Sequence, residues 1–148
     1  MADPLSIAVG ITSLIGVSLK LSHGLKDVCA KFQRAPQTIS SLYRECSNTS
    51  TGLVTLNRLL QSRANVLVSA QESNQDFLAC FDLTIVNMAQ TFSVLDDQFH
   101  KLSGGDDSLG KLSLRMRFMW IDGELNTLMQ ELRDQRSALV FLIECIQL

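Results

Sequence analysis

The stretch "DPLSIAVGITSLIGVSLK", residues 3–20, holds sixteen consecutive residues without a charge between Asp3 and Lys20. A signal peptide is not indicated, because no basic region precedes the apolar part and no small-residue cleavage site follows it. Sixteen helical residues rise about 24 Å, which is short of the roughly 30 Å hydrocarbon core of a bilayer. We therefore expect this stretch to remain on the mature protein as one helix of a bundle.

Four series of apolar residues recur at alternating spacings of three and four along the chain, over residues 7–32, 39–60, 78–102 and 121–146. This spacing places each series on one stripe of an α-helix. No segment of comparable length alternates with period two, so strands are not expected. The sequence predicts an all-α fold, an antiparallel bundle of four long helices plus one short helix. It forms a single domain over residues 1–148, and its first helix covers about residues 4–34.

Proline, glycine and polar residues mark the expected helix boundaries. Pro36 separates the first two helices, and the polar residues 69–74 form a break before the third. "SGGDDS" at 103–108 ends the third helix, with a glycine available for a left-handed cap. Residues 108–120 are expected to form the short helix and a corner, and Asp122 caps the last helix.

The composition indicates a compact globular domain, with 46% hydrophobic residues and 19% charged ones. A net charge of −2 gives no support for a nucleic-acid partner, which usually requires a strongly basic domain. The cysteines, Cys29, Cys46, Cys80 and Cys145, include no C-x-x-C pair, so we expect reduced thiols of a cytoplasmic protein.

Two motifs resemble chemical sites but are better explained otherwise. "GDDSLGKL" at 105–112 approaches a phosphate-binding loop, yet Leu112 stands where the motif needs a hydroxyl. Asp96, Asp97 and His100 lie within about one helical turn and are expected to form a solvated surface rather than a metal site. No nucleophile signature is present. We expect no catalytic residue, no metal ligand, no cofactor and no enzymatic activity.

The first helix carries more apolar surface than one face can hold. Over residues 20–34, apolar residues share one side and basic residues the other, but Leu5, Val9, Ile15 and Leu19 fall on the side that is charged further along. We expect the bundle to cover this half on all sides at rest. Alternatively, the segment leaves the bundle and enters a bilayer, where its basic continuation meets anionic head groups. The candidate membrane-targeting or interface residues are Leu5, Ile7, Val9, Ile11, Leu14, Ile15, Val17 and Leu19, and the candidate head-group or partner contacts are Lys20, Lys26, Lys31 and Arg34.

Small residues and the energy of burial bear on these alternatives. Ala8, Thr12 and Gly16 recur at intervals of four and permit close approach of another helix, in a membrane or in a soluble core. The eight large apolar side chains are worth about 1.5–3 kcal/mol each when buried. Their sum is comparable to or above a typical domain stability of about 5–15 kcal/mol. Release of the helix therefore requires a membrane to receive it and self-association to shift the equilibrium.

Two further features lie before the last helix. Trp120 is the only tryptophan and is expected to be a structural anchor at the corner, because an indole ring buries a large area. Lys111, Arg115 and Arg117 form a small basic group, which we interpret as a solvated face, with lipid head groups or an acidic partner as the alternative.

Both ends of the chain resemble a known family. "MADPLSIAVGITSLIGVSLKL" and "LRMRFMWIDGELNTLMQELRDQRSALVFLI" are similar to the fungal N-terminal domains, often called HeLo-like, that precede NACHT-type or other STAND modules. In that family a tryptophan-containing corner precedes a helix with regularly spaced leucines and a basic residue before its last apolar turn. The residues that match this pattern are Trp120, Leu125, Leu128, Leu132, Arg136 and Leu139.

The resemblance implies an all-helical effector or signalling domain of a fungal NLR-like protein, acting in programmed cell death, heterokaryon incompatibility and innate immunity. Oligomerisation would expose the N-terminal helix, here Leu5 to Leu19, which then attacks the plasma membrane. The implied partners are further copies of the chain (a dimer at rest), an anionic membrane on activation, and a downstream STAND or NACHT module. The membrane-killing members often carry an acidic residue in the first apolar stretch, and this chain has none after Asp3. The alternative function is a self-associating adaptor without membrane activity.

Overall fold

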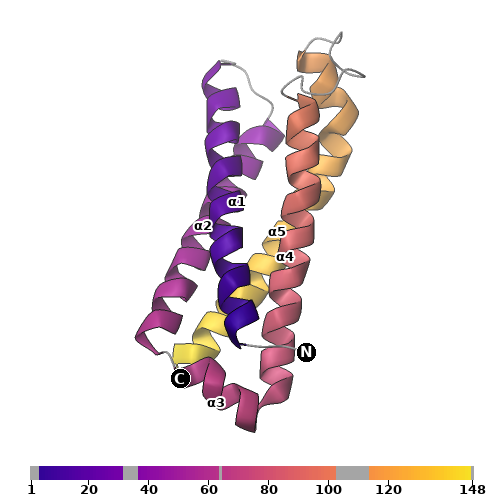
Figure 1. The fold of residues 1–148 in the computed structure, drawn as a ribbon. Helices are drawn as coiled ribbons and strands as arrows, with labels where there is room; N and C mark the ends of the chain where they lie inside the picture. The colour runs from indigo at the N-terminus through magenta and orange to yellow at the C-terminus, as the bar shows by residue number, and fades with distance from the viewer. Residues whose placement is uncertain (1–3, 32–36, 64, 103–113, 148) are drawn as a thin grey trace.

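The computed structural model describes residues 4–31, 37–63, 65–102 and 114–147, which are helical almost throughout (Figure 1). No strand occurs in these ranges, so the prediction of an all-helical chain is confirmed for them. The helices are α1 (Pro4–Lys31), α2 (Gln37–Ser62), α3 (Asn65–Ser73), α4 (Gln75–Leu102) and α5 (Leu114–Gln147).

The four long helices form a ring in which each has two principal neighbours. α1 packs against α2 and α4, and α5 packs against the same two helices on the other side. α1 and α4 run in one direction, α2 and α5 in the other, and α3 crosses at the end where α2 stops and α4 starts (Figure 1). The neighbours α1–α2 and α4–α5 therefore run antiparallel, whereas α1–α4 and α2–α5 run in the same direction.

The predicted position of the short helix is wrong. The short helix is α3, which overlaps the segment that we expected to be a polar break, and the break itself is Asn74. The side-chain Oδ1 of Asn74 accepts a hydrogen bond of 3.1 Å from the backbone N–H of Phe77 and so caps the start of α4. Residues 114–120 are the first turns of α5, so Asp122 lies inside that helix and does not cap it. Pro36 and the segment 103–113 lie outside the described residues.

The predicted apolar stripes meet in one core. Almost every described member of the four series is buried, and the polar member on α1, Ser18, is buried as well. Its hydroxyl donates a 3.0 Å hydrogen bond to the carbonyl of Ile15, which satisfies it within the helix. The largest fully buried side chains include Ile7, Ile11, Leu21, Leu25, Ile39, Leu42, Leu53, Leu56, Leu78, Phe81, Met88 and Phe92.

Two glycines of α1 bring its backbone close to α4. A Cβ added to Gly10 would lie 2.8 Å from Cγ2 of Ile85, and one added to Gly24 would lie 2.6 Å from Cζ of Phe99. Both distances are too short for a real contact, so the α4 side chains occupy the space that a larger residue would fill. By contrast, nothing lies within 4 Å of a Cβ added to Gly16.

Substitution of these glycines by alanine should have opposite effects on stability. Gly16→Ala should raise the free energy of unfolding by about 0.5–1 kcal/mol, because alanine favours a helix and meets no neighbour. Gly10→Ala should lower the free energy of unfolding by about 1–3 kcal/mol, because the added methyl clashes with Cγ2 of Ile85, which is too close to the α4 backbone to move away easily. Urea denaturation of both variants measures the difference, and equal stabilisation by both would contradict the close α1–α4 contact.

A buried carboxylate joins α2 to α5. Glu45 is 7% exposed, and its Oε1 and Oε2 lie 3.2 Å from Nε of Arg133 and 3.2 Å from Nη1 of Arg136. Two guanidinium groups therefore compensate one buried negative charge. The neighbouring thiol of Cys46 is fully buried, and this burial, assisted by the negative charge of Glu45, raises its pKa from 9.0 to about 12.

The raised pKa of Cys46 predicts a specific loss of stability at alkaline pH. The native thiol keeps its proton where the unfolded one loses it, so the native state binds more protons between pH 9.0 and about 12. The free energy of unfolding should therefore fall as the pH rises through this window. Urea denaturation of the wild type and of Cys46→Ala isolates this contribution from other titrating groups. An equally steep fall in the variant would assign the effect to another group.

Candidate functional site

The outward surface of the first half of α1 is the candidate functional site, and we name it the outer face of α1. Leu5, Val9 and Leu19 on it are 70%, 61% and 43% exposed. None of its residues is charged, and nothing in the described chain covers it. The outer face consists of the exposed residues between Pro4 and Leu19, which are Leu5, Ser6, Ala8, Val9, Thr12, Ser13, Gly16 and Leu19.

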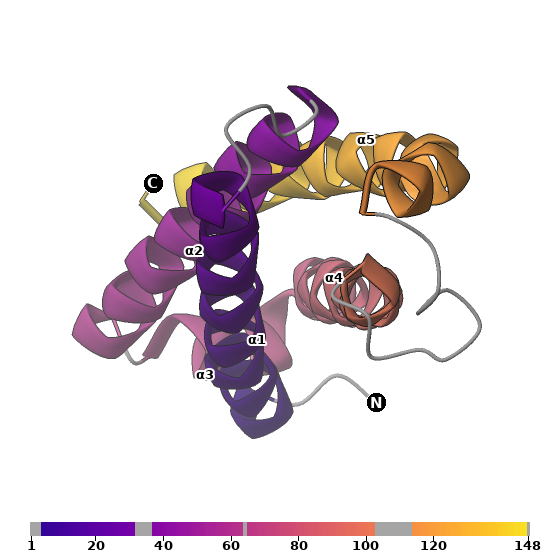
Figure 2. The same ribbon diagram turned by 90° about the horizontal axis from the view of Figure 1, so that it is seen from above.

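The expectation that the bundle covers this half of α1 on all sides is wrong. In a ring of four helices, α1 contacts α2 and α4, with a smaller contact to α3, and the side away from these neighbours faces outward (Figure 2). The eight candidate residues therefore divide by position. Ile7, Ile11 and Leu14 are buried in the core, Ile15 and Val17 are half-buried, and Leu5, Val9 and Leu19 are exposed.

The small residues Ala8, Thr12 and Gly16 lie on the outer face and not in the core. The Thr12 hydroxyl donates a 3.1 Å hydrogen bond to the carbonyl of Ala8, so its proton is used within the helix. A hydroxyl satisfied in this way costs less to remove from water than a free one. The outer face is thus less polar than its composition indicates.

The surface of α1 changes from uncharged to charged within one turn. Beyond Leu19 the exposed residues include Lys20, His23, Lys26 and Asp27. The candidate head-group contacts Lys20 and Lys26 are therefore exposed and follow the outer face directly. The side chains of Lys31 and Arg34 lie outside the described part of the chain.

The other sequence candidates do not add to this site. Asp96 and His100 lie one turn apart on α4, with 3.6 Å between Oδ2 and Nε2. Within the described residues, no group of three or more histidine, cysteine, aspartate or glutamate side chains could hold a metal ion. The segment 105–112 and the side chains of Lys111, Arg115, Arg117 and Trp120 lie outside the described part.

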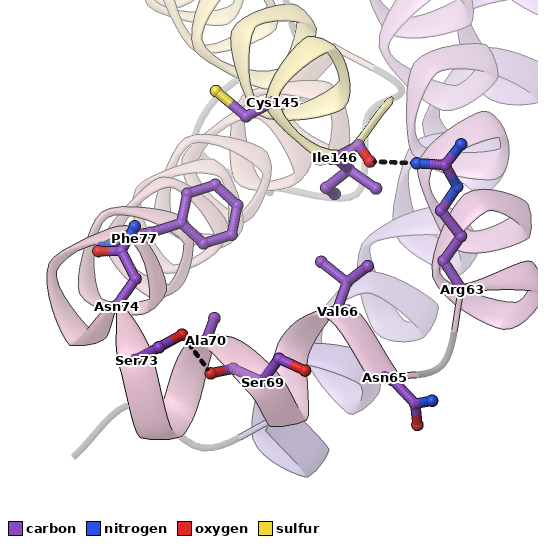
Figure 3. Close-up of a pocket in the computed structure, with 10 residues that line it drawn as sticks. All are labelled: Arg63, Asn65, Val66, Ser69, Ala70, Ser73, Asn74, Phe77, Cys145 and Ile146. Atoms are coloured by element: carbon purple, nitrogen blue, oxygen red, sulfur yellow. Dashed lines mark hydrogen bonds between the residues drawn. The ribbon is translucent and has the colours of Figure 1, made fainter. Parts of the chain in front are cut away.

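Sequence reasoning missed a cavity of about 610 Å³ where α3 meets the start of α4 and the end of α5 (Figure 3). Its apolar wall includes Val66, Phe77 and Ile146, and Nη1 of Arg63 donates a 2.7 Å hydrogen bond to the carbonyl of Ile146 at one side. No histidine or acidic residue is among the described residues that line it, and Cys145 contributes a thiol. No sequence signal could have found this cavity, because it follows from the unexpected position of α3.

Two helices are long and apolar enough to cross a membrane, judged by length and composition alone: Pro4–Ala30 and Gln75–His100. A buried core helix of a soluble protein passes the same test. Length and composition therefore indicate membrane contact only when the exposed surface of the helix is apolar as well.

Comparison of the chain with family models, with curated proteins and with solved structures found no match.

The position of each candidate determines which substitutions can test the site. Val9→Glu should change the free energy of unfolding by no more than about 0.5 kcal/mol, because the side chain is largely in water. Ile11→Glu places an unpaired charge in the core and should prevent folding. Thermal unfolding followed by circular dichroism compares the two. A folded Ile11→Glu variant of normal stability would contradict the assignment of inner and outer faces.

Proposed function

We propose that this chain is the N-terminal effector or signalling domain of a fungal NLR-like protein and is not an enzyme. In this proposal the domain is a bundle of four long helices and the short helix α3, and long helices that follow one another in the sequence run antiparallel. The domain oligomerises and targets the plasma membrane through α1, and so induces cell death. One observation carries the proposal: the outer face of α1 presents large apolar side chains and no charge.

The free energy of burial favours binding of the outer face of α1 to a membrane before α1 leaves the bundle. Leu5, Val9 and Leu19 already face water, so their transfer into an apolar surrounding costs no core contact. Each large apolar side chain contributes about 1.5–3 kcal/mol on full burial, and less where it is already partly covered. Ile7 and Ile11, fully buried on the opposite side, hold α1 in the resting bundle. Full release therefore follows only when a membrane and neighbouring copies compensate for the lost core.

Charge supports an anionic membrane as the target. Lys20 and Lys26 lie directly beyond the outer face, and a basic residue near an anionic surface contributes about 1 kcal/mol. Asp27 lies beside them and offsets part of this attraction. At rest the domain is expected in the cytoplasm, joined in the full-length protein to a STAND or NACHT module that controls its oligomerisation.

The second candidate function is a self-associating adaptor without membrane activity. Ala8, Thr12 and Gly16 on the outer face would let the α1 helix of a second copy approach closely. A symmetric dimer would then cover Leu5 and Val9 on both chains.

Vesicle leakage distinguishes the two functions. Wild-type protein should bind vesicles of equimolar phosphatidylcholine and phosphatidylserine and release a trapped dye. Val9→Glu should weaken binding roughly tenfold or more, because it removes apolar area and adds a charge. Phe141→Glu is the matched control, since Phe141 is 60% exposed on α5 while Val9 is 61% exposed.

Equal weakening of vesicle binding in Val9→Glu and Phe141→Glu would contradict the membrane function. The absence of dye leakage with the wild type at any protein concentration would contradict it as well. A stable dimer that Val9→Glu dissociates, without any effect on vesicles, would favour the adaptor. Analytical ultracentrifugation of the same proteins provides this second readout.

A further inference from the structure

α1 and α4 lie side by side in a constant register. From Gly10 to Ile85 and from Gly24 to Phe99 the step is 75 residues in both cases, and the two contacts are four turns apart. The helices run in the same direction (Figure 1), so between these two contacts a residue of α1 lies level with the residue of α4 that follows it by this step. Leu19 is thus level with Val94.

The exposed surface of α4 is also uncharged over most of its length, and we name this surface the outer face of α4. Leu83, Val86 and Val94 on it are 59%, 42% and 46% exposed. Asp82 lies within this stretch and is half-buried, and the charges that flank the stretch are Asp76 before it and Asp96 and Asp97 after it. The outer face of α4 consists of Ala79, Cys80, Leu83, Val86, Asn87, Ala89, Gln90, Ser93 and Val94.

The two outer faces end at the same height. The first charged residue after the outer face of α1 is Lys20, and the first after the outer face of α4 is Asp96. The register places Asp96 one residue above the level of Lys20. A protein partner does not require two helices to become charged at one level. A bilayer does, because the boundary between hydrocarbon and head groups is a plane. The sixteen residues from Pro4 to Leu19 correspond to about 24 Å of helix below this boundary.

The contact between α4 and α5 includes buried polar side chains, whereas the contacts of Ile85 and Phe99 with α1 are apolar. Oγ1 of Thr91 lies 3.4 Å from Oε2 of Glu131, and Gln98 donates to Oε2 of Glu124. Gln135 donates to Oγ1 of Thr91 at 2.8 Å, while its own buried Oε1 has no hydrogen-bond partner. A cavity of about 370 Å³ lies along this seam. Water can replace these hydrogen bonds when the seam opens, whereas it cannot replace the apolar contacts of Ile85 and Phe99.

Two buried threonines of α4 that an opened seam would uncover, Thr84 and Thr91, are satisfied within the helix. Thr84 donates to the carbonyl of Cys80 at 2.9 Å, and Thr91 donates to that of Asn87 at 3.1 Å. Gln98 lies above Val94 and so beyond the uncharged part. For these two hydroxyls the bonds meet a requirement of a helix in hydrocarbon, which is that polar groups find partners within the protein.

We propose that α4 is the second membrane-facing helix and that α1 and α4 engage the bilayer together, as one parallel pair that separates from α5 along the α4–α5 seam and from α2 along the more extensive α1–α2 contact. The uncharged outer faces meet the hydrocarbon, and Lys20, Lys26, Asp96 and Asp97 lie at the level of the head groups. This inference rests on the membrane function proposed above and concerns which helices carry it out.

A disulfide between α1 and α4 tests the pair directly. A Cβ on Gly10 would lie 2.8 Å from Cγ2 of Ile85, so it lies at most about 4.3 Å from Cβ of Ile85, which is within the Cβ–Cβ reach of a disulfide between Gly10→Cys and Ile85→Cys. Both the locked protein and its reference carry Cys80→Ser, which removes the exposed native thiol. The oxidised, locked protein should release dye from the phosphatidylcholine and phosphatidylserine vesicles as fast as its reduced form. Leakage that appears only after reduction would overturn the inference and show that α1 acts alone.

Charge substitution on α4 supplies the second test. Val94→Glu should weaken vesicle binding roughly tenfold. Val140→Glu on α5 should leave it unchanged, although the two valines are 46% and 48% exposed and receive the same charge. Equal binding by the two variants would overturn the role of α4. If the unlocked, unsubstituted protein neither binds nor permeabilises vesicles, the proposed function itself fails, and this outcome is distinct from the failure of the pair.

Discussion

α1 has apolar side chains on two opposite faces, and a helix in a ring of four can bury only one of them. Ile7 and Ile11 on the inner face are completely buried, whereas Leu5 and Val9 on the outer face are mostly exposed. The hydrophobic effect therefore acts on this helix twice, once to hold the bundle together and once to favour an apolar surrounding outside it. The core, the outer face and the proposed function all depend on this conflict within one helix.

The two parallel helix pairs differ in the kind of contact that joins them. The parallel pair α2–α5 holds the buried charge, Glu45 between Arg133 and Arg136, and Arg63 bonds the last turn of α5. The parallel pair α1–α4 is joined through glycines that admit apolar side chains. Ion pairs resist transfer into lipid and glycine contacts do not, so the two pairs suit different surroundings. The buried ion pairs of one pair and the apolar glycine contacts of the other give a physical basis for a structure that divides at a membrane surface.

The sequence predicted the inner stripes because spacings of three and four translate directly into a buried helix face. It also placed Leu5, Val9 and Leu19 opposite that stripe, but the cover expected for them depended on helix neighbours, which a sequence does not specify. Asp122 was misplaced as a cap because α5 begins at Leu114 and runs through Gly123, although glycine disfavours a helix interior. The outer face of α4 was missed altogether, because Leu83 and Val94 are scattered between core positions and gain meaning only from their register with α1.

The measurement that tests the central claim most directly is photolabelling by a phospholipid that carries a diazirine in its acyl chain, with the labelled residues mapped by mass spectrometry. The unmodified protein is bound to vesicles that contain the probe and then illuminated. The account predicts labels between Leu5 and Leu19, where α1 meets hydrocarbon, and none on Val140 or Phe141 of α5. Labels confined to α5, or a first half of α1 that stays unlabelled while the protein is bound, would contradict it.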